Sequence, residues 1–305
     1  MFFSLRELRV LGANLWLSRL NLGATIADHR YIREYMTIGF IGAGVMARAL
    51  GKGLVQGGIV PATDLICSAP TPQDGRLFLD LLPGARWTAN NREVVRQSDL
   101  TILAVKPQVM AEAMFALCET SAGKLFLSIA AGVTIEMIRD RLHSTARVVR
   151  AMPNTPMQIG MGASVYAGGP NVTGDDLALV DRVLSSAGRA WRVDENQIDT
   201  ITALSGSGPA YVFHFTDALI RGAVALGLPE ELAKDLAIQT VLGSAQLAAQ
   251  SALSPLKLAA QVKSPRGTTL AGCAVLEEHD ALNELMARCL AAAKRRAEEL
   301  ARGEP

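Results

Sequence analysis

The segment Ser264-Pro265-Arg266-Gly267-Thr268-Thr269 carries residues whose types and spacing suit the binding of a small anion. It follows one helical pattern and opens the next. The first N–H groups of a helix lack intrahelical partners and carry the positive end of the helix dipole, so they attract anions. The two threonines add hydroxyls that can donate or accept hydrogen bonds. An ordinary helix cap, with Ser or Thr as the N-cap residue, fits the same pattern. The loop alone leaves both interpretations open.

A glycine-rich turn near the other end of the chain favours the anion site. An apolar strand pattern at residues 37–41 runs directly into Gly42-Ala43-Gly44-Val45-Met46-Ala47, with the spacing G-x-G-x-x-A. The first glycine permits a tight turn, the second lets the backbone approach a pyrophosphate, and the alanine lets helix and strand pack closely. A helical pattern through Leu54 and a second strand at residues 64–67 follow. Together they predict a dinucleotide-binding Rossmann unit.

The end of the second strand bears on which dinucleotide binds. A site for NAD usually carries Asp or Glu there to accept from the ribose 2′-OH. This chain instead reads Cys67-Ser68-Ala69-Pro70-Thr71, without a carboxylate. The hydroxyls of Ser68 and Thr71 can donate to a 2′-phosphate. Arg76 is a candidate for added positive charge. The pattern favours NADPH and leaves NADH open.

Composition excludes several classes of function. The 305 residues include 30 Lys and Arg against 29 Asp and Glu, which gives no support to binding of nucleic acid or a membrane surface. No apolar run reaches the length of a membrane span. The four cysteines have no paired spacing, which predicts reduced thiols and a cytoplasmic protein. The four histidines have no ligand at metal-binding spacing, so no metal site is predicted.

The elements that must position these residues divide the chain into three parts. Residues 36–195 alternate strand and helix patterns, which predicts an α/β Rossmann-type domain with a parallel sheet. Residues 196–305 are Ala- and Leu-rich with helical periodicity, which predicts an all-helical substrate-binding and dimerisation domain. Within it, Ser207-Gly208-Pro209 predicts a fresh helix start. Residues 1–35 are an extension that the Rossmann pattern does not need. We expect it to be poorly ordered and to reflect a mis-called start rather than a transit-like peptide or an added helix.

Six blocks in this order resemble pyrroline-5-carboxylate reductase, the last enzyme of proline biosynthesis. They are residues 39–44 (GFIGAG), 104–107 (AVKP), 128–134 (SIAAGVT), 150–156 (RAMPNTP), 204–211 (LSGSGPAY) and the loop from Ser264. The resemblance covers residues 36–300. It implies that NADPH or NADH reduces the cyclic imine 1-pyrroline-5-carboxylate to L-proline. It also implies a homodimer or a ring of dimers, in which the helical half of one subunit completes the site of its neighbour.

The resemblance also assigns residues. The cofactor contacts fall on Gly42, Ala43, Gly44, Val45, Met46, Ala47, Ser68, Pro70, Asn90, Ala104, Val105, Lys106, Pro107, Ala130, Ala131, Gly132 and Gln261. The substrate contacts fall on Glu195, Ser264, Gly267, Thr268 and Thr269. The backbone N–H groups near the two threonines would hold the substrate carboxylate, with the Thr269 hydroxyl facing the ring nitrogen as the catalytic group. A solvated surface position is the alternative for Glu195.

One residue departs from the family pattern, which has Gly-Gly where this chain has Arg266-Gly267. If position 266 needs a positive φ, arginine is strained there by about 1–2 kcal/mol. A guanidinium at the mouth of the site could instead attract an anionic substrate, or φ is negative and Arg266 simply points into water. Two rival functions stay open from sequence: another oxidoreductase, with Lys234 as the only candidate catalytic lysine, and a non-catalytic NAD(P)-binding protein.

Overall fold

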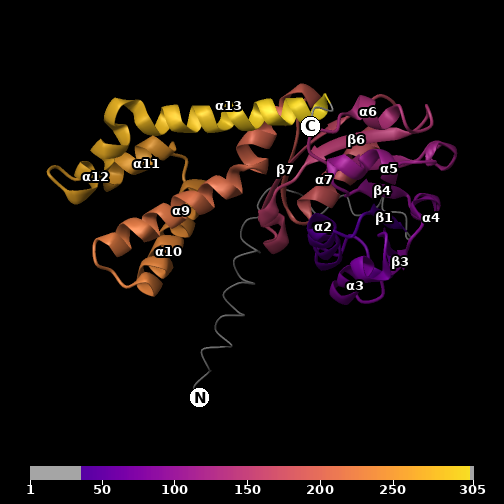
Figure 1. Cartoon of the computed structure of the whole chain (residues 1–305), viewed down its shortest axis with the longest axis horizontal. Helices are drawn as coiled ribbons and strands as arrows, with labels where there is room; N and C mark the ends of the chain where they lie inside the picture. The colour runs from indigo at the N-terminus through magenta and orange to yellow at the C-terminus, as the bar shows by residue number, and fades with distance from the viewer. Residues whose placement is uncertain (1–35, 303–305) are drawn as a thin grey trace, which may run out of the picture. The chain divides into compact units, whose positions relative to one another are not determined.

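The computed structural model describes residues 36–302 (Figure 1). The expectations for the extension, residues 1–35, lie outside the described residues. From Thr37 onward the chain forms one compact unit, so the division at residues 195 and 196 stays a prediction. No helix within residues 36–302 is long and apolar enough to cross a membrane.

The core of the fold is an eight-stranded sheet with the strand order β3-β2-β1-β4-β5-β6-β7-β8. Four strands, β1, β2, β4 and β5, are buried at every residue, as expected for parallel strands covered on both faces. Between β1 and β4 the strand order changes direction, which is where doubly wound sheets bind their ligands. The bounds are β1 Ile38–Ile41, β2 Leu65–Ser68, β3 Arg86–Thr88, β4 Leu100–Leu103, β5 Leu125–Ser128, β6 Arg147–Met152, β7 Gly162–Gly168 and β8 Gly188–Arg192.

The predicted parallel arrangement is correct for six strands and wrong for one pairing. β7 runs antiparallel to β6 and parallel to β8. The physical reason is the short connection after β6, a single 3-10 turn at Thr155–Ile159 that ends at Gly160 with φ +75°. A parallel return needs a crossover of a dozen or more residues, so this chain must turn back antiparallel. Strand β3, which sequence analysis missed, is a three-residue edge strand with no fully buried residue.

Helices cover both faces of the sheet. α4 (Asn91–Gln97), α5 (Met110–Ala113) and α6 (Ile135–Arg139) contribute to one buried apolar cluster against the strands. α2 (Val45–Gln56) contacts both α3 (Pro72–Leu81) and α7 (Gly174–Ser185), and these three add nothing to that cluster. They therefore pack the opposite face. The fold is α/β with a Rossmann-type sheet, as predicted.

Beyond β8 the described chain contains helices only. They are α8 Ile198–Ile201, α9 Gly208–Ala225, α10 Glu230–Gln250, α11 Pro255–Val262, α12 Thr268–Glu277 and α13 Ala281–Ala301. The predicted helix start at Ser207-Gly208-Pro209 is confirmed, because Ser207 is the N-cap and α9 begins at Gly208 with Pro209 in its first turn. A π-helical segment, Thr202–Gly206, lies between α8 and this start. Such π segments recur at functional sites.

Candidate active site

The glycine turn between β1 and α2 has the geometry that a dinucleotide needs. Gly42 has φ +103°, and an added Cβ would lie 2.7 Å from the Ala104 carbonyl oxygen. Gly44 is the N-cap of α2 with ordinary φ −71°, no side chain caps the helix, and an added Cβ there would meet nothing within 4 Å. The first glycine is thus required by conformation and packing, whereas the second leaves open space at the helix N-terminus. The α2 first turn carries no acid, so these residues fit a pyrophosphate.

The other predicted cofactor residues near this turn lie after the ends of neighbouring strands. Ala104 follows β4, and its N–H donates to the Ile41 carbonyl at 2.8 Å. Ala130 follows β5, so the AVKP and SIAAG blocks meet at one edge of the sheet. Gly132 has φ +70° and lies beneath α13, where an added Cβ would be 2.7 Å from Leu300 Cβ. The structure therefore brings these segments together around the switch in strand order.

At the end of β2 the predicted phosphate donors are already engaged. Ser68 is 1% exposed, and its hydroxyl donates to the Phe40 carbonyl at 3.4 Å. Thr71 is the N-cap of α3, and its hydroxyl donates to the Asp74 carboxylate at 2.7 Å. Pro70 is exposed. Asn90, also a predicted contact, is the N-cap of α4, and its Oδ1 accepts from the Arg92 N–H at 3.0 Å.

The thiol of Cys67, next to Ser68 in β2, is made unreactive by its burial. Cys67 is fully buried in β2, and burial raises the pKa of its thiol to about 12. Desolvation disfavours the thiolate, so this cysteine stays protonated and unreactive at neutral pH.

The substrate loop is a tight turn that ends at a helix without a side-chain cap. The Gly267 N–H donates to the Ser264 carbonyl at 3.0 Å, with Pro265 second and Arg266 third in the turn. Arg266 is exposed and has φ +60°. Proline second and a positive φ third are the features of a type II turn, whose third position favours glycine. The strained alternative for Arg266 is therefore correct, and the negative-φ alternative is wrong.

The alternative of an ordinary helix capped by Ser or Thr is also wrong. Gly267 is the N-cap of α12, with φ −79° and ψ 163°, and no side chain caps this helix. An added Cβ at Gly267 would lie 3.1 Å from the Ser264 carbonyl oxygen and would displace the Ser264 hydroxyl, so the turn is tight at this position. Thr268 and Thr269 form the first turn, and their backbone N–H groups stay available to a ligand.

An ion pair that sequence analysis missed spans this loop. Lys263, the C-cap of α11, pairs with Glu277, the last residue of α12. The hydrogen bond that Lys263 donates to the Glu277 carboxylate raises the pKa of Lys263, so the ammonium stays charged through the physiological range. The ion pair connects Lys263, just before the Ser264–Gly267 turn, to the C-terminal end of α12.

Glu195 takes part in a charged network inside the protein. Its Oε1 accepts from the Ile135 N–H at 2.8 Å and lies 3.5 Å from Nη1 of Arg150. Arg150 is 2% exposed and also pairs with Asp199 at 2.5 Å. The network joins β6, the N-terminus of α6 and α8. Glu195 is thus not a freely solvated glutamate, although its contact with substrate stays a prediction. In the sequence, Arg150 stands out as an arginine within an apolar strand pattern, and this signal could have indicated that it has charged partners.

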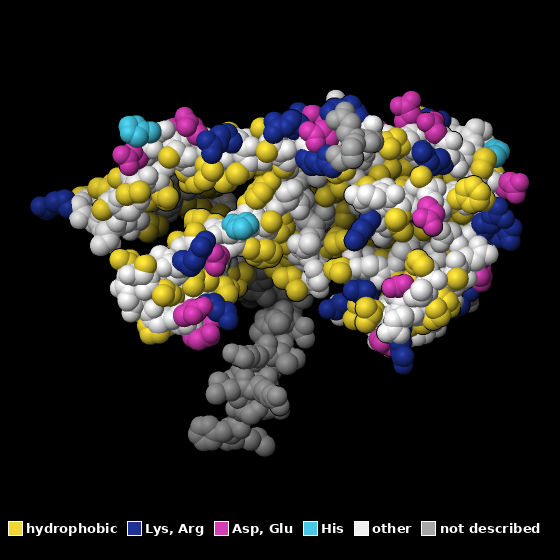
Figure 2. Space-filling view, viewed as in Figure 1, with side chains coloured by type: hydrophobic (Ala, Val, Ile, Leu, Met, Phe, Trp, Pro, Cys, Tyr) yellow, Lys and Arg dark blue, Asp and Glu magenta, His cyan; other side chains and the backbone are white. Residues whose placement is uncertain are grey.

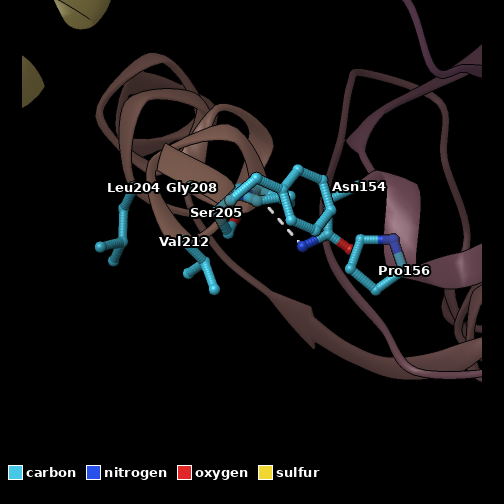
Figure 3. Close-up of a pocket in the computed structure, with 8 residues that line it drawn as sticks. Asn154, Pro156, Leu204, Ser205, Gly208 and Val212 are labelled. Atoms are coloured by element: carbon cyan, nitrogen blue, oxygen red, sulfur yellow. Dashed lines mark hydrogen bonds between the residues drawn. The ribbon is translucent and has the colours of Figure 1, made fainter. Parts of the chain in front are cut away.

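A cavity of about 340 Å³ lies where the chain leaving β6 meets the π segment and α9. Figure 3 shows Asn154 at its wall, with Nδ2 donating to the Ser205 carbonyl at 3.0 Å. The Asn154 Oδ1 accepts from the Ala163 N–H at 2.8 Å, so both polar ends of this side chain are satisfied. The cavity offers mainly apolar surface, from Pro156, Leu204, Pro209, Val212 and Phe213.

The loop of the two threonines does not lie beside the glycine turn of its own chain. α12 packs mainly against α13 and the 3-10 turn between them. In Figure 1, α11 and α12 lie with α9, α10 and the first turns of α13, apart from the strands. Gln261, predicted to contact the cofactor, belongs to this group on α11. One chain therefore holds the two halves of the predicted site at a distance from each other.

A Rossmann-type sheet with an open glycine turn, followed by a helical region, defines the class of NAD(P)-dependent oxidoreductases. Residues 37–132 match the family described as NADP oxidoreductase, coenzyme F420-dependent. Residues 195–300 match the family described as pyrroline-5-carboxylate reductase dimerisation.

Whole-chain similarity is more specific. Pyrroline-5-carboxylate reductase of Pisum sativum is 39% identical over 265 residues, which cover 87% of this chain and 96% of that protein. The crystal structure of pyrroline-5-carboxylate reductase from Coxiella burnetii is 36% identical, with a TM-score of 0.81, and covers 87% of this chain and 98% of that one. The Plasmodium falciparum pyrroline carboxylate reductase with NADP bound is 29% identical, with a TM-score of 0.80, and covers 88% of this chain and 100% of that one. The chain belongs to the pyrroline-5-carboxylate reductase family.

Proposed function

We propose that this enzyme reduces the C=N bond of 1-pyrroline-5-carboxylate to L-proline with a nicotinamide cofactor, the final step of proline biosynthesis. The observation that carries the proposal is the uncapped N-terminus of α12, directly after the tight Ser264–Gly267 turn. A helix N-terminus without a side-chain cap is suited to a carboxylate. Family membership supplies the substrate that bears one.

The residues of this chain bind and orient the reactants. Gly42 and Gly44 shape the turn on which the pyrophosphate would lie, and the N–H groups of Gly267, Thr268 and Thr269 would hold the substrate carboxylate. Each charge-assisted hydrogen bond there is worth about 1.5–3 kcal/mol. The bound nicotinamide supplies the hydride for ring carbon 5. The Thr269 hydroxyl would hold the ring nitrogen, whose proton can come from solvent.

This division of roles assigns binding, and no proton transfer, to Glu195 and Lys106, the two ionisable residues among the predicted contacts. An iminium nitrogen that arrives protonated needs no strong acid from the protein. Catalysis then rests on orientation, which can supply several kcal/mol of the barrier. Thr269 acts as an orienting hydrogen bond or proton relay.

The site proposed is shared between two chains of a homodimer, alone or within a ring of dimers. The helices α9, α11 and α12 have no buried residue in the single chain, and apolar side chains cover this region in Figure 2. Leu226 is 90% exposed and Leu256 is 82% exposed. Apolar faces this extensive normally pack against another chain. The match of residues 195–300 to a dimerisation family supports the same proposal.

The cofactor proposed is NADPH in preference to NADH. No carboxylate stands at the end of β2 to accept from a ribose 2′-OH, and a relative of 29% identity binds NADP. A cytoplasmic location is part of the proposal, supported by four free cysteines.

The proposal is tested by following NADPH oxidation at 340 nm with pyrroline-5-carboxylate and, separately, with its six-membered analogue. We expect turnover with the five-membered imine and a lower kcat/KM with the larger ring. A faster reaction with the six-membered ring would transfer the assignment to a different cyclic imine. Tight NADPH binding without reduction of either imine would instead favour a non-catalytic NAD(P)-binding protein.

A further inference from the structure

The two side-chain hydroxyls of the β2–α3 connection are not free to donate to the phosphate that distinguishes NADPH from NADH. The Ser68 hydroxyl donates to a strand carbonyl and the Thr71 hydroxyl donates to Asp74. Asp74 also places a negative charge in the first turn of α3. A 2′-phosphate at this position therefore needs a cation from another element.

Arg48, in the first turn and a half of α2, is such a cation. Its Nη1 donates to the Ala43 carbonyl at 3.0 Å, so the side chain folds back over the glycine turn instead of extending into solvent. The side chain is half-buried. A guanidinium group has five N–H donors. Within residues 36–302, the bond to the Ala43 carbonyl is the hydrogen bond that the Arg48 side chain makes. The remaining donors are available to a planar anion such as a phosphate.

The direction in which Arg48 lies follows from the packing of its helix. Residues three apart on a helix share a face. At Gly51, three residues after Arg48, an added Cβ would lie 2.7 Å from Leu82 Cδ1 and 3.5 Å from Phe78 Cζ, so this side of α2 faces α3 and the residue that follows it. Arg48 therefore belongs to the face of α2 that turns towards α3.

Backbone hydrogen bonds connect the two ends of this region. The Gly42 N–H donates to the Ser68 carbonyl at 3.0 Å, so the turn that Arg48 grips is bonded directly to the last residue of β2. In Rossmann-type sites the adenosine ribose lies at this strand end. A side chain held on this turn can reach a group attached to that ribose.

We propose that Arg48 binds the 2′-phosphate of the cofactor and sets a preference for NADPH over NADH. The inference rests on the proposed nicotinamide cofactor. Asp74 acts in the opposite direction, because its carboxylate repels the same phosphate. The preference of this chain is thus set by a cation on α2 against an anion on α3, and neither residue belongs to the glycine motif.

The test measures dinucleotide affinity by calorimetry on the full-length protein, with NADP⁺, NAD⁺, adenosine 2′,5′-bisphosphate and 5′-AMP as probes. The variant is Arg48→Gln, because glutamine can still donate to the Ala43 carbonyl while the charge is removed. Lys52→Gln is the matched control, since Lys52 lies one turn further along the same helix face and is also half-buried. Arg76→Gln tests the other arginine near this strand end.

We expect Arg48→Gln to weaken NADP⁺ and the bisphosphate about tenfold or more, the value of one charge-assisted bond, and to change NAD⁺ and 5′-AMP less than about threefold. Lys52→Gln should change none of them by more than about threefold. Asp74→Asn should tighten NADP⁺ selectively. Equal weakening of NADP⁺ and NAD⁺ by Arg48→Gln, or a selective loss in Arg76→Gln alone, would overturn the inference. Failure of the unmodified protein to bind any dinucleotide would instead reject the cofactor proposal itself.

Discussion

Replacing Arg266 with glycine is expected to stabilise the protein although it deletes a long side chain. Arg266 has φ +60° at the third position of the Ser264–Gly267 turn. A left-handed conformation is unfavourable by about 1–2 kcal/mol for a residue with a Cβ. Glycine relieves this strain but adds about 0.4–1 kcal/mol of freedom to the unfolded chain. The difference predicts that the free energy of unfolding rises by about 0.5–1 kcal/mol.

Arg266→Ala is the control that separates strain from charge. Alanine keeps the Cβ and therefore the strain, whereas both variants lose the guanidinium. The assay is urea unfolding followed by circular dichroism, at one fixed protein concentration because the stability of a dimer depends on it. The slope m should be equal in all three proteins, so that a shift in midpoint reports stability. If alanine stabilises as much as glycine, the strain account is refuted.

The same pair of variants tests the charged mouth. If Arg266 attracts the substrate carboxylate, both variants raise KM at low ionic strength. The difference from the unmodified enzyme then shrinks as salt is added, since exposed charges are screened within about 10 Å at 0.1 M. A KM unchanged at low salt in both variants would show that the arginine contributes strain and no attraction.

Four further predictions concern single positions. Gly42→Ala should lower the free energy of unfolding by about 2 kcal/mol or more, because φ is +103° and a Cβ would lie 2.7 Å from the Ala104 carbonyl. Gly44→Asp should leave stability within about 0.5 kcal/mol, since aspartate is a good N-cap, yet abolish dinucleotide binding in a fluorescence titration. Thr269→Ala should lower kcat about tenfold, and by more than Thr268→Val does, because the Thr269 hydroxyl is the one proposed to meet the ring nitrogen. Equal turnover in both variants would argue against this role. For Cys67, a folded-state pKa of about 12 against 9.0 unfolded means that the unfolded chain loses its proton first as pH rises. Stability should therefore fall from about pH 9 upward, by about 1.4 kcal/mol per pH unit for this one group, and Cys67→Ala should remove that part of the slope. Burial and a hydrogen bond to Asp181 raise the pKa of Tyr166 to about 12 as well, so its part of the alkaline slope should persist in both proteins.

Local patterns were enough to predict most of the sheet and the glycine turn, although β3 was missed and β7 was not expected to be antiparallel. The turn at Gly42 and Gly44 lies between a continuous apolar strand and a helix, so spacing alone defines its geometry. The sequence also predicted that a helix opens at the Ser264–Thr269 loop, and the structure begins that helix at Thr268. The antiparallel β7 could also have been found, because the turn after β6 is too short for a crossover.

Interactions between distant residues could not be predicted from these patterns. Glu195 meets the Ile135 N–H across 60 positions, and Asp199 meets Arg150 across 49. Nothing near either acid in sequence specifies its partner. The sign of φ at Arg266 and the occupation of the Ser68 hydroxyl likewise depend on how the chain folds around them.

The central claim is that the glycine turn of one chain works with the threonine loop of another. Gly44→Asp is designed to block cofactor binding, and Thr269→Asp is designed to block substrate binding. Each aspartate lies at a helix N-terminus, where a negative charge is tolerated by the fold. The measurement is the imine reductase activity of the two variants co-expressed with different tags and purified on both. Each mixed dimer then contains one intact shared site, so activity should return to as much as about half that of the unmodified enzyme, while each parent alone stays inactive. Mixed dimers as inactive as their parents would show that both halves of the site come from the same chain.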